Sequence, residues 1–559
     1  MFLYGHGMAR EQRGPAREGV SAREVVAAAA AAVFLALVTT WPLPARLGSH
    51  VPEVGFGDPY IQAWQVAWGG HALATPADLF EANVFWPEQD SFAFSDALIG
   101  YAPAGILGSG STAALVRYNL LFLCAYALPF FAAFLLAREL GASPVAAAVA
   151  GAAFAYAPFR SDQATHLHVI SSGAIPLALF ALVRGYGRSR PGWVLAGWLV
   201  ATWQVAIGFS LGLQLAYLLL VTGVCVLAPA ATRGWRNYDR RLVVPTVAGV
   251  AVLLVYSTWQ AIPYLRVARE HPAAARTERE VDLYSPPAAA FLAAPDGNRL
   301  WGGATDAARD ALRRPTEQSL FPGAVTTVLA IAGAAAGSLR RRLRWALAAG
   351  TLVTALLALG TSPWFGDYLY GALYELAPGW QGVRTPGRLV TLTSLGLALL
   401  AAFGAEVAVR AVRADRRGGW VAAGLALAVV VEGAGRISVT PAPAVPAAAV
   451  EAPAPQLHLP SDEQTDRVYT YFSTDGFPEM VNGLGAFTPR TLDEVRANTA
   501  GFPDAASIGY LASLGVSSVV FHPALAEKTP WADVATTPVE GLPVTREDHG
   551  AVIVFRLVP

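Results

Sequence analysis

The sequence predicts an α-helical polytopic membrane protein of about eleven transmembrane helices, followed by a small C-terminal α/β domain. Three observations support this fold class. Apolar residues make up 54% of the 559 residues and charged residues only 14%, against about 25% charged in soluble domains. Long apolar runs recur along the chain, and arginine gathers in alternate connections between them. An ordinary soluble enzyme, a disordered chain and a coiled coil are excluded.

The charges balance, with 40 basic and 40 acidic residues, so no nucleic-acid partner is expected. The two cysteines, Cys124 and Cys225, lie inside apolar runs and offer neither a disulfide framework nor a thiolate metal site. The sequence contains no phosphate-binding glycine loop, no dinucleotide motif and no zinc-protease or serine-hydrolase motif. A nucleotide cofactor is therefore not expected.

Eleven apolar segments are each long enough, or nearly so, to cross a bilayer, which takes about 20 helical residues. They lie near 23–43, 117–137, 144–158, 169–184, 192–208, 210–230, 242–263, 320–338, 345–360, 388–412 and 419–434. The first is longer than a signal-peptide core and has no evident small-residue cleavage site, so we expect an anchor. These segments define a membrane domain over 23–434, preceded by a cytoplasmic tail over 1–22.

The arginines predict the orientation, because short cytoplasmic loops are enriched in them. With the N-terminus inside, every inner connection carries at least one arginine, and four of five carry three or four. The short outer turn between the third and fourth spans has only Arg160. An odd number of spans then places the C-terminus outside. Three long loops, 44–116, 264–319 and 361–387, also lie outside, so we expect the functional site there.

The C-terminal segment begins with a Pro/Ala-rich linker over 435–460, in which 440–455 is too rich in proline for regular structure. An extracytoplasmic α/β domain over 461–559 follows. Its pattern predicts strands at 467–472, 517–523 and 551–558 and helices at 491–500 and 506–515.

The first outer loop is the most informative. GDPYIQAWQVAW (57–68) has a helical pattern with Trp64 and Trp68 on one face, typical of a helix at the outer headgroup level. Asp58 before a proline is common as a helix N-cap, and Asp96 is open to the same interpretation. Either carboxylate could instead be a general base. Asp58 could also bind a divalent cation such as Mg²⁺ or Mn²⁺ facing a lipid phosphate.

The turn PFRSDQATHLHV (158–169) gathers Arg160, His166 and His168. The two-residue spacing of the histidines does not favour a zinc site. A solvated loop with interfacial histidines and a substrate-binding surface are equally compatible with this turn.

GVRTPGR (382–388) places Arg384 and Arg388 at the outer start of the tenth span, with Thr385 expected as its N-cap. The helix dipole disfavours cations there by about 0.3–1 kcal/mol each. A phosphate would offset this cost because guanidinium binds phosphate bidentately. Snorkelling to lipid headgroups is the alternative.

These features resemble the GT-C superfamily of integral-membrane glycosyltransferases. The resemblance rests on GDPYIQAWQVAW (57–68), NVFWPEQDSFAFSD (83–96), AFAYAPFRSDQATHLH (153–168), GVRTPGR (382–388) and VNGLGAF (481–487). It implies a GT-C-like domain in a bacterial inner membrane, a polyprenyl-phosphate sugar donor, and an extracytoplasmic glycan, lipid or protein acceptor. Asp58 would correspond to the first-loop acidic residue. Many members carry two adjacent acids there, whereas Pro59 follows Asp58, which leaves Asp96 as the candidate second acid.

Three functions stay open from the sequence. In the leading one, a glycosyltransferase, Asp58 deprotonates the acceptor and Arg384 and Arg388 hold the leaving phosphate. The other candidate substrate-binding residues are Arg160, His166, His168, Trp64 and Trp68. A transporter or flippase of a lipid-linked sugar would need ionisable residues within the spans, and these are nearly free of charge. The third function is a non-catalytic cell-envelope assembly protein.

Overall fold

The computed structural model describes residues 20–53, 55–233, 239–362, 366–412 and 417–558. Most of the expected N-terminal tail, and parts of the arginine-rich connections at 234–238 and 413–416, lie outside these residues. The chain divides into two compact units. Unit 1 comprises Met1–Trp41, Phe122–Trp259 and Arg276–Ile437, and unit 2 comprises Pro42–Leu121, Gln260–Ala275 and Ser438–Pro559. Two of the five boundaries between them fall within helices α4 (Gly110–Leu140) and α10 (Val243–Glu270).

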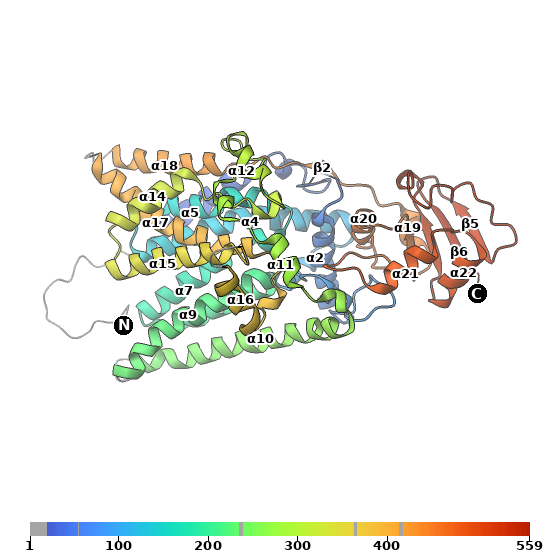
Figure 1. The fold of residues 1–559 in the computed structure, drawn as a ribbon, viewed down its shortest axis with the longest axis horizontal. Coiled ribbons are helices and arrows are strands. Elements are labelled where there is room, and N and C mark those ends of the chain that lie inside the picture. The colour runs from blue at the N-terminus through green and yellow to red at the C-terminus, as the bar shows by residue number, and fades with distance from the viewer. Residues whose placement is uncertain (1–19, 54, 234–238, 363–365, 413–416, 559) are drawn as a thin grey trace. The chain divides into compact units, whose positions relative to one another are not determined.

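Unit 1 is helical (Figure 1). Its helices are α1 (Ala22–Thr39), α5 (Pro144–Ala155), α6 (Leu167–Ile170), α7 (Ala174–Gly187), α8 (Pro191–Ile207), α9 (Phe209–Arg233), α11 (Glu278–Tyr284), α12 (Asp306–Asp310), α13 (Pro315–Gln318), α14 (Ala324–Ala336), α15 (Arg341–Ala358), α16 (Gly366–Leu376), α17 (Val390–Ala411) and α18 (Arg417–Gly433). Short 3₁₀ helices include η4 (Pro158–Ser161) and η11 (Pro386–Leu389).

Helix α17 is central to unit 1 because it packs against α5, α14, α15 and α18. Its closest approach is to α14, where Gly404 faces the backbone of Leu329. A Cβ at Gly404 would lie 1.8 Å from the Leu329 carbonyl oxygen. Small residues at such crossings allow helix backbones to approach closely, so this glycine sets the α14–α17 spacing.

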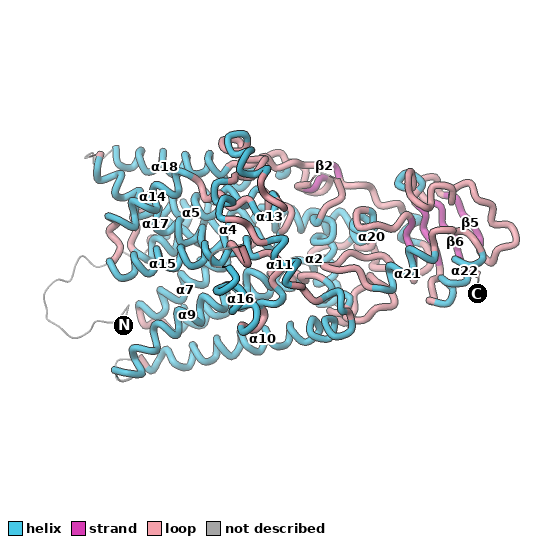
Figure 2. Tube along the Cα trace, viewed as in Figure 1, coloured by secondary structure: helices cyan, strands magenta, loops and turns pink. Residues whose placement is uncertain are grey.

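The expected spans all coincide with helices (Figure 2). Among the described residues, five helical stretches have the length and apolar composition to cross a membrane: Ala22–Thr39, Gly110–Leu140, Leu167–Gly187, Arg240–Glu270 and Pro386–Ala411. Five shorter apolar helices coincide with further expected spans: Pro144–Ala155, Pro191–Ile207, Phe209–Cys225, Ala324–Ala336 and Gly419–Gly433. The segment expected at 345–360 lies in α15, which begins with three arginines. The chain is therefore mostly helical, with several apolar helices.

Unit 2 combines the first loop with the C-terminal segment. Its elements are β1 (His50–Val51), α2 (Asp58–Ala74), α3 (Ala102–Gly105), β2 (Thr440–Pro441), α19 (Ala447–Glu451), β3 (Gln456–Leu459), α20 (Thr465–Phe472), α21 (Arg490–Asn498), α22 (Ala505–Ser513), β4 (Ser518–Phe521), β5 (Val544–Asp548) and β6 (Ile553–Leu557). β1 pairs with β2, and the other strands form a sheet of order β3-β4-β6-β5. β3 and β4 are parallel, and the remaining pairs in the sheet are antiparallel.

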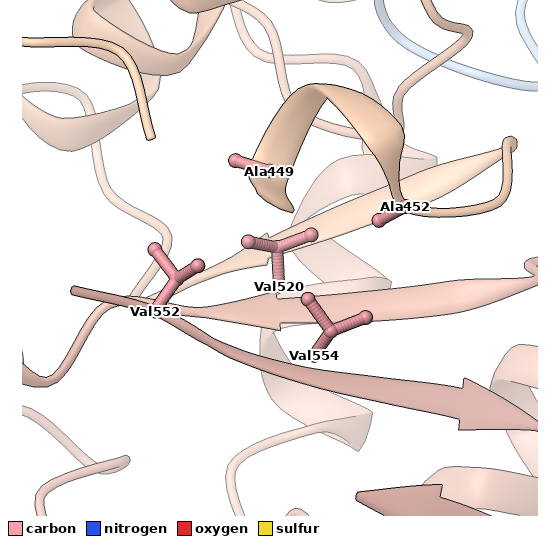
Figure 3. Close-up of a cluster of buried hydrophobic side chains, with 5 residues drawn as sticks. All are labelled: Ala449, Ala452, Val520, Val552 and Val554. Carbon is pink, nitrogen blue, oxygen red and sulfur yellow. The ribbon is translucent and has the colours of Figure 1, made fainter. Parts of the chain in front are cut away.

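Helix α19 covers part of the sheet. Its Ala449, with Ala452 just beyond it, packs on Val520, Val552 and Val554 (Figure 3). The expectation of irregular structure across 440–455 is therefore wrong for this helix, whose alanines gain a buried apolar contact that the proline content did not reveal. The sheet begins at β3, inside the expected linker, and not after residue 460.

The strand expected at 467–472 is also wrong, because these residues lie in helix α20. A short apolar run does not distinguish a buried strand from a buried helix by periodicity alone, and α20 is buried over most of its length. The helices expected at 491–500 and 506–515 are present as α21 and α22. The strands expected at 517–523 and 551–558 are present as β4 and β6.

Candidate functional site

Helix α2 begins at Asp58. Gly57 occupies the N-cap position, and no side chain makes a capping hydrogen bond there. The N-cap interpretation of Asp58 is therefore wrong. Asp58 is instead the first helical residue, where the helix dipole favours a negative charge. Its side chain is 34% exposed, whereas every residue from Pro59 to Gly70 is buried. The carboxylate therefore lies where a buried helix reaches accessible surface.

The two tryptophans of α2 do not form a membrane-facing surface. Both are buried. The indole N–H of Trp64 donates to Oδ1 of Asn83, and that of Trp68 donates to the carbonyl of Leu79, each at 2.9 Å. The expected interfacial indole face is therefore wrong. A helical apolar pattern is the same for a helix buried by its own chain and one buried in lipid, so the sequence could not separate the two.

Two charged groups flank Asp58. Nε of Arg467, on α20, lies 3.6 Å from Oδ1 of Asp58, and Nη1 of Arg467 donates to the carbonyl of Glu463 at 2.9 Å. The carboxylate of Glu53 lies against Gly57, in the place that a Cβ would occupy. The start of α2 thus carries two carboxylates and one guanidinium.

Asp96 lies beside a later turn of α2. Its carbonyl accepts a hydrogen bond from Nε2 of Gln65 at 2.9 Å. Gln65 is about two helical turns, or roughly 10 Å of rise, further along α2 than Asp58. The carboxylate that lies against the start of α2 is that of Glu53. The sequence could have suggested it, since Glu53 lies five residues before Asp58 in the same loop, whereas nothing in the sequence indicated Arg467.

A divalent cation on Asp58 is not supported by the side chains around it. Within the described residues, no group of three or more His, Cys, Asp or Glu side chains is arranged to hold a metal ion. The start of α2 offers two carboxylates with a guanidinium beside them, and a cation would compete with Arg467 for Asp58.

In unit 1, Arg388 is paired with an acid of the same chain. Nη2 donates to Oε1 of Glu317 at 2.7 Å and Nε donates to Oε2 at 3.4 Å. The side chains are only 12% and 10% exposed. Burial alone would raise the pKa of Glu317, but Arg388 and then His166 hold it below its ordinary value. Glu317 therefore supplies the anion for which a phosphate was expected at Arg388.

The histidines of the 158–169 turn extend this ion pair. Nε2 of His168 lies 3.3 Å from Nη1 of Arg388. Gln163 donates to Oε2 of Glu317 at 3.1 Å, and its Oε1 lies 3.2 Å from Nδ1 of His166. The two rings are 5.9 Å apart. The irregular turn therefore brings both histidines to one side, which a strand or a regular helix would not do.

Arg384 lies in a second group of charges in unit 1. Its guanidinium is 4.9 Å from the ring of Tyr284, and that of Arg314 is 5.8 Å from the same ring. Glu280 pairs with both Arg276, at 3.1 Å, and Arg384, at 3.7 Å. One carboxylate thus serves two guanidinium groups. Thr385 takes the expected N-cap position, with Pro386 following, but it precedes η11 and not α17 directly, and its side chain forms no capping hydrogen bond.

Arg160 does not reach a substrate surface. It is 2% exposed, and its guanidinium donates to Oγ of Ser172 and to the carbonyls of Ala125 and Ile170. It also lies 5.5 Å from the ring of Tyr126. The expectation of Arg160 as a substrate ligand is wrong, because these contacts fix it inside unit 1.

Known proteins resemble this chain in structure and not in sequence. The sequence matches no protein-family model and no curated protein. The fold is similar to arabinofuranosyltransferase AftD from Mycobacteria, with a TM-score of 0.55 and 17% identity, over 97% of this chain and 42% of that one. The chain thus spans less than half of that enzyme. The Archaeoglobus fulgidus oligosaccharyltransferase gives a TM-score of 0.45 at 15% identity, covering 89% and 69%. ArnT from Cupriavidus metallidurans gives 0.36 at 14%, covering 95% and 97%.

Proposed function

We propose that this chain, which has the GT-C fold of the mycobacterial arabinofuranosyltransferase, is a membrane glycosyltransferase. It would move a sugar from a polyprenyl-phosphate donor to an extracytoplasmic glycan, lipid or protein. The observation that carries the proposal is Asp58, a partly exposed carboxylate at the first residue of an otherwise buried helix. A carboxylate presented in this way is suited to general-base catalysis.

In this reaction Asp58 takes the proton of the acceptor hydroxyl. The acceptor oxygen forms a bond to the anomeric carbon of the sugar as the bond from that carbon to the phosphate oxygen breaks. Polyprenyl phosphate leaves with the bonding electrons. Arg467, 3.6 Å from Asp58, orients the carboxylate before the transfer.

We propose the group around Tyr284 as the part of unit 1 that holds the donor phosphate. Arg384 is 35% exposed, and Glu280, the one acid within 4.0 Å of it in the described part of the chain, is shared with Arg276. Its guanidinium therefore keeps donors for a phosphate, to which it can bind bidentately. Arg388 is excluded from this role because Glu317 occupies its fork.

We further propose eleven spans in a bacterial inner membrane, with the N-terminus inside and the 438–558 segment outside. The inner-side arginines support this orientation. Several of them have acidic partners in unit 1: Arg138 with Glu24 at 3.1 Å, and Arg184 with Glu139 at 2.9 Å. Pairing of this kind allows charges to remain at the ends of helices that border the membrane.

Purified protein incubated with a radiolabelled polyprenyl-phosphate sugar tests the proposal. Label transferred to an acceptor, or released as sugar, supports a glycosyltransferase. Movement of the intact donor across the membrane of vesicles that contain the reconstituted protein would support the flippase instead. An intact donor that neither moves nor reacts would leave the assembly protein as the better description.

A further inference from the structure

Arg160 carries a buried positive charge without an acidic partner. Three hydrogen bonds satisfy Nη1 and Nη2, with oxygens of Ser172, Ala125 and Ile170 at 2.7–2.9 Å. These acceptors are neutral. Among the described residues, no carboxylate lies within 4.0 Å of this guanidinium, in contrast to Arg388 and Arg309, which are both paired with acids.

The remaining nitrogen, Nε, has no hydrogen-bond partner although it is buried. Burial lowers the pKa of Arg160 to about 10, so the group is still charged at neutral pH. An uncompensated buried charge is costly, and such charges in folded proteins are normally paired with another ion.

Arg160 lines a cavity of about 20 Å³ in unit 1. The other polar groups of its wall are Thr39, at the end of α1, the phenols of Tyr126 and Tyr156, and Ser161. Residues 433–435, where α18 ends, also line it. The Tyr156 hydroxyl is also buried with no hydrogen bond at normal geometry. Two donors of the lining residues, Nε–H of Arg160 and O–H of Tyr156, thus lack a hydrogen bond of ordinary geometry, and Thr39 is the group that interacts with the Tyr156 hydroxyl.

The volume limits what the cavity can hold. A site of about 10–15 Å³ on this measure accommodates one water, so 20 Å³ accommodates one small particle. A phosphate or a carboxylate-bearing ligand is too large. A single water would satisfy Nε but would leave the charge of Arg160 uncompensated.

We propose that this cavity binds one monatomic monovalent anion of the size of chloride, held by Nε–H of Arg160 and O–H of Tyr156. The anion pairs the buried guanidinium and connects the 158–161 turn with the ends of α1 and α18. It is separate from the proposed transfer reaction, which uses neither Arg160 nor Tyr156. Removing the anion therefore lowers the stability of unit 1.

The test measures the binding of radioactive chloride (³⁶Cl⁻) to the full-length protein in detergent, together with its thermal denaturation midpoint. Chloride is compared with gluconate at constant ionic strength. We expect saturable binding near one chloride per chain, competition by bromide, and a midpoint that rises with chloride. The Tyr156→Phe variant keeps Arg160 and should raise the half-saturating chloride concentration about tenfold, as a lost hydrogen bond to an ion predicts.

Arg160→Gln should abolish both binding and the chloride-dependent shift. The matched control is Arg313→Gln, which removes an exposed arginine paired with Asp282 and should leave chloride binding unchanged. If Arg160→Gln fails to fold, chloride binding by the Tyr156→Phe variant and by the wild-type protein tests the proposal instead. Absence of saturable chloride binding in the wild-type protein, or equal binding in Tyr156→Phe, would overturn the proposal.

Discussion

Arg467 of α20 lies 3.6 Å from Asp58 at the start of α2, although 408 residues separate them in the sequence. The C-terminal segment thus contributes a guanidinium to the neighbourhood of the first-loop carboxylate. The guanidinium is placed to orient the Asp58 carboxylate at the start of α2. This relationship gives the catalytic role of Asp58 a direct test.

Asp58→Asn should lower turnover by about a hundredfold or more, the usual scale for a lost acid–base group. Asparagine has nearly the same shape but cannot accept the proton. Stability should change little, because Asp58 does not cap α2 and loses only a dipole contribution of about 0.3–1 kcal/mol and a partly exposed ion pair. Transfer assays and thermal denaturation measure the two effects separately.

The matched control is Asp96→Asn. The backbone carbonyl of Asp96 accepts a hydrogen bond from Gln65, and that contact survives the substitution. We expect a smaller loss of turnover than in Asp58→Asn. Normal transfer by a folded Asp58→Asn protein would remove the general base from the mechanism, while the fold would stand.

Glu317→Gln should destabilise the protein by about 3–5 kcal/mol, because it leaves the charge of Arg388 buried and unpaired. The side chains of both partners are at most 12% exposed. Asp282→Asn is the control, since it breaks the exposed pair with Arg313 and should cost at most about 1 kcal/mol. Denaturation of both variants measures the difference. Equal losses would contradict a structural role for the Arg388–Glu317 pair.

Arg384→Gln should raise the KM for the donor about tenfold with little change in kcat, as expected when a contact is made equally in the ground and transition states. The reason is the loss of one charge-assisted hydrogen bond to phosphate. Arg384→Lys should recover only part of the affinity, since lysine lacks the planar fork. Steady-state kinetics over donor concentration measure this. An unchanged KM in Arg384→Gln would leave Arg384 as a partner of Tyr284 and Glu280 alone.

The apolar helices were predictable because their signal is local. Each expected span depends on about 20 consecutive residues, and each coincides with a helix. The buried environment of Trp64 was not predictable, since its partner Asn83 lies in an irregular segment of the same loop. The same applies to α19, where alanines between prolines become helical by packing on Val520.

The candidate site was predictable only in part. Asp58 was identified because an acid beside a proline and a helical pattern is visible in one short stretch. The partners that decide the roles of Asp58 and Arg388 are Arg467 and Glu317, and both come from distant segments. Charge pairing of this kind depends on tertiary structure, and single-sequence patterns do not encode it.

A reporter that is active only in the cytoplasm, fused after the last residue, should be silent. The reason is the arginine enrichment of the inner connections together with an odd number of spans. The same reporter fused after Arg188, in the inner connection between the fourth and fifth expected spans, should be active and serves as the control. An active C-terminal fusion would place Asp58 and the C-terminal segment on the cytoplasmic side.

The sheet of unit 2 should lose stability on acidification. His458 and His522 are buried, with Nδ1 and Nε2 3.0 Å apart. Burial lowers the pKa of His458 well below its ordinary value and that of His522 to about 3. As pH falls below about 6.5, the unfolded chain takes up two protons that the folded sheet does not, so the free energy of unfolding falls.

Asp466 acts in the opposite sense. Burial raises its pKa to about 7, against the effect of Arg496, so its contribution is present at low pH and is lost as pH rises toward 7. From about pH 6.5 down to the pH at which the folded histidines take up protons, these three groups together give a net difference of one proton, or about 1.4 kcal/mol per pH unit. Asp466→Asn removes the carboxyl group that keeps a proton in the folded sheet, so the net difference becomes two protons. The slope of the free energy of unfolding against pH should therefore double, whatever the substitution does to stability at about pH 7. Hydrogen exchange of the β3 and β4 amides in the full-length protein, corrected for intrinsic rates, measures the slope. An unchanged slope in Asp466→Asn would mean that Asp466 is already ionised in the folded sheet throughout this range.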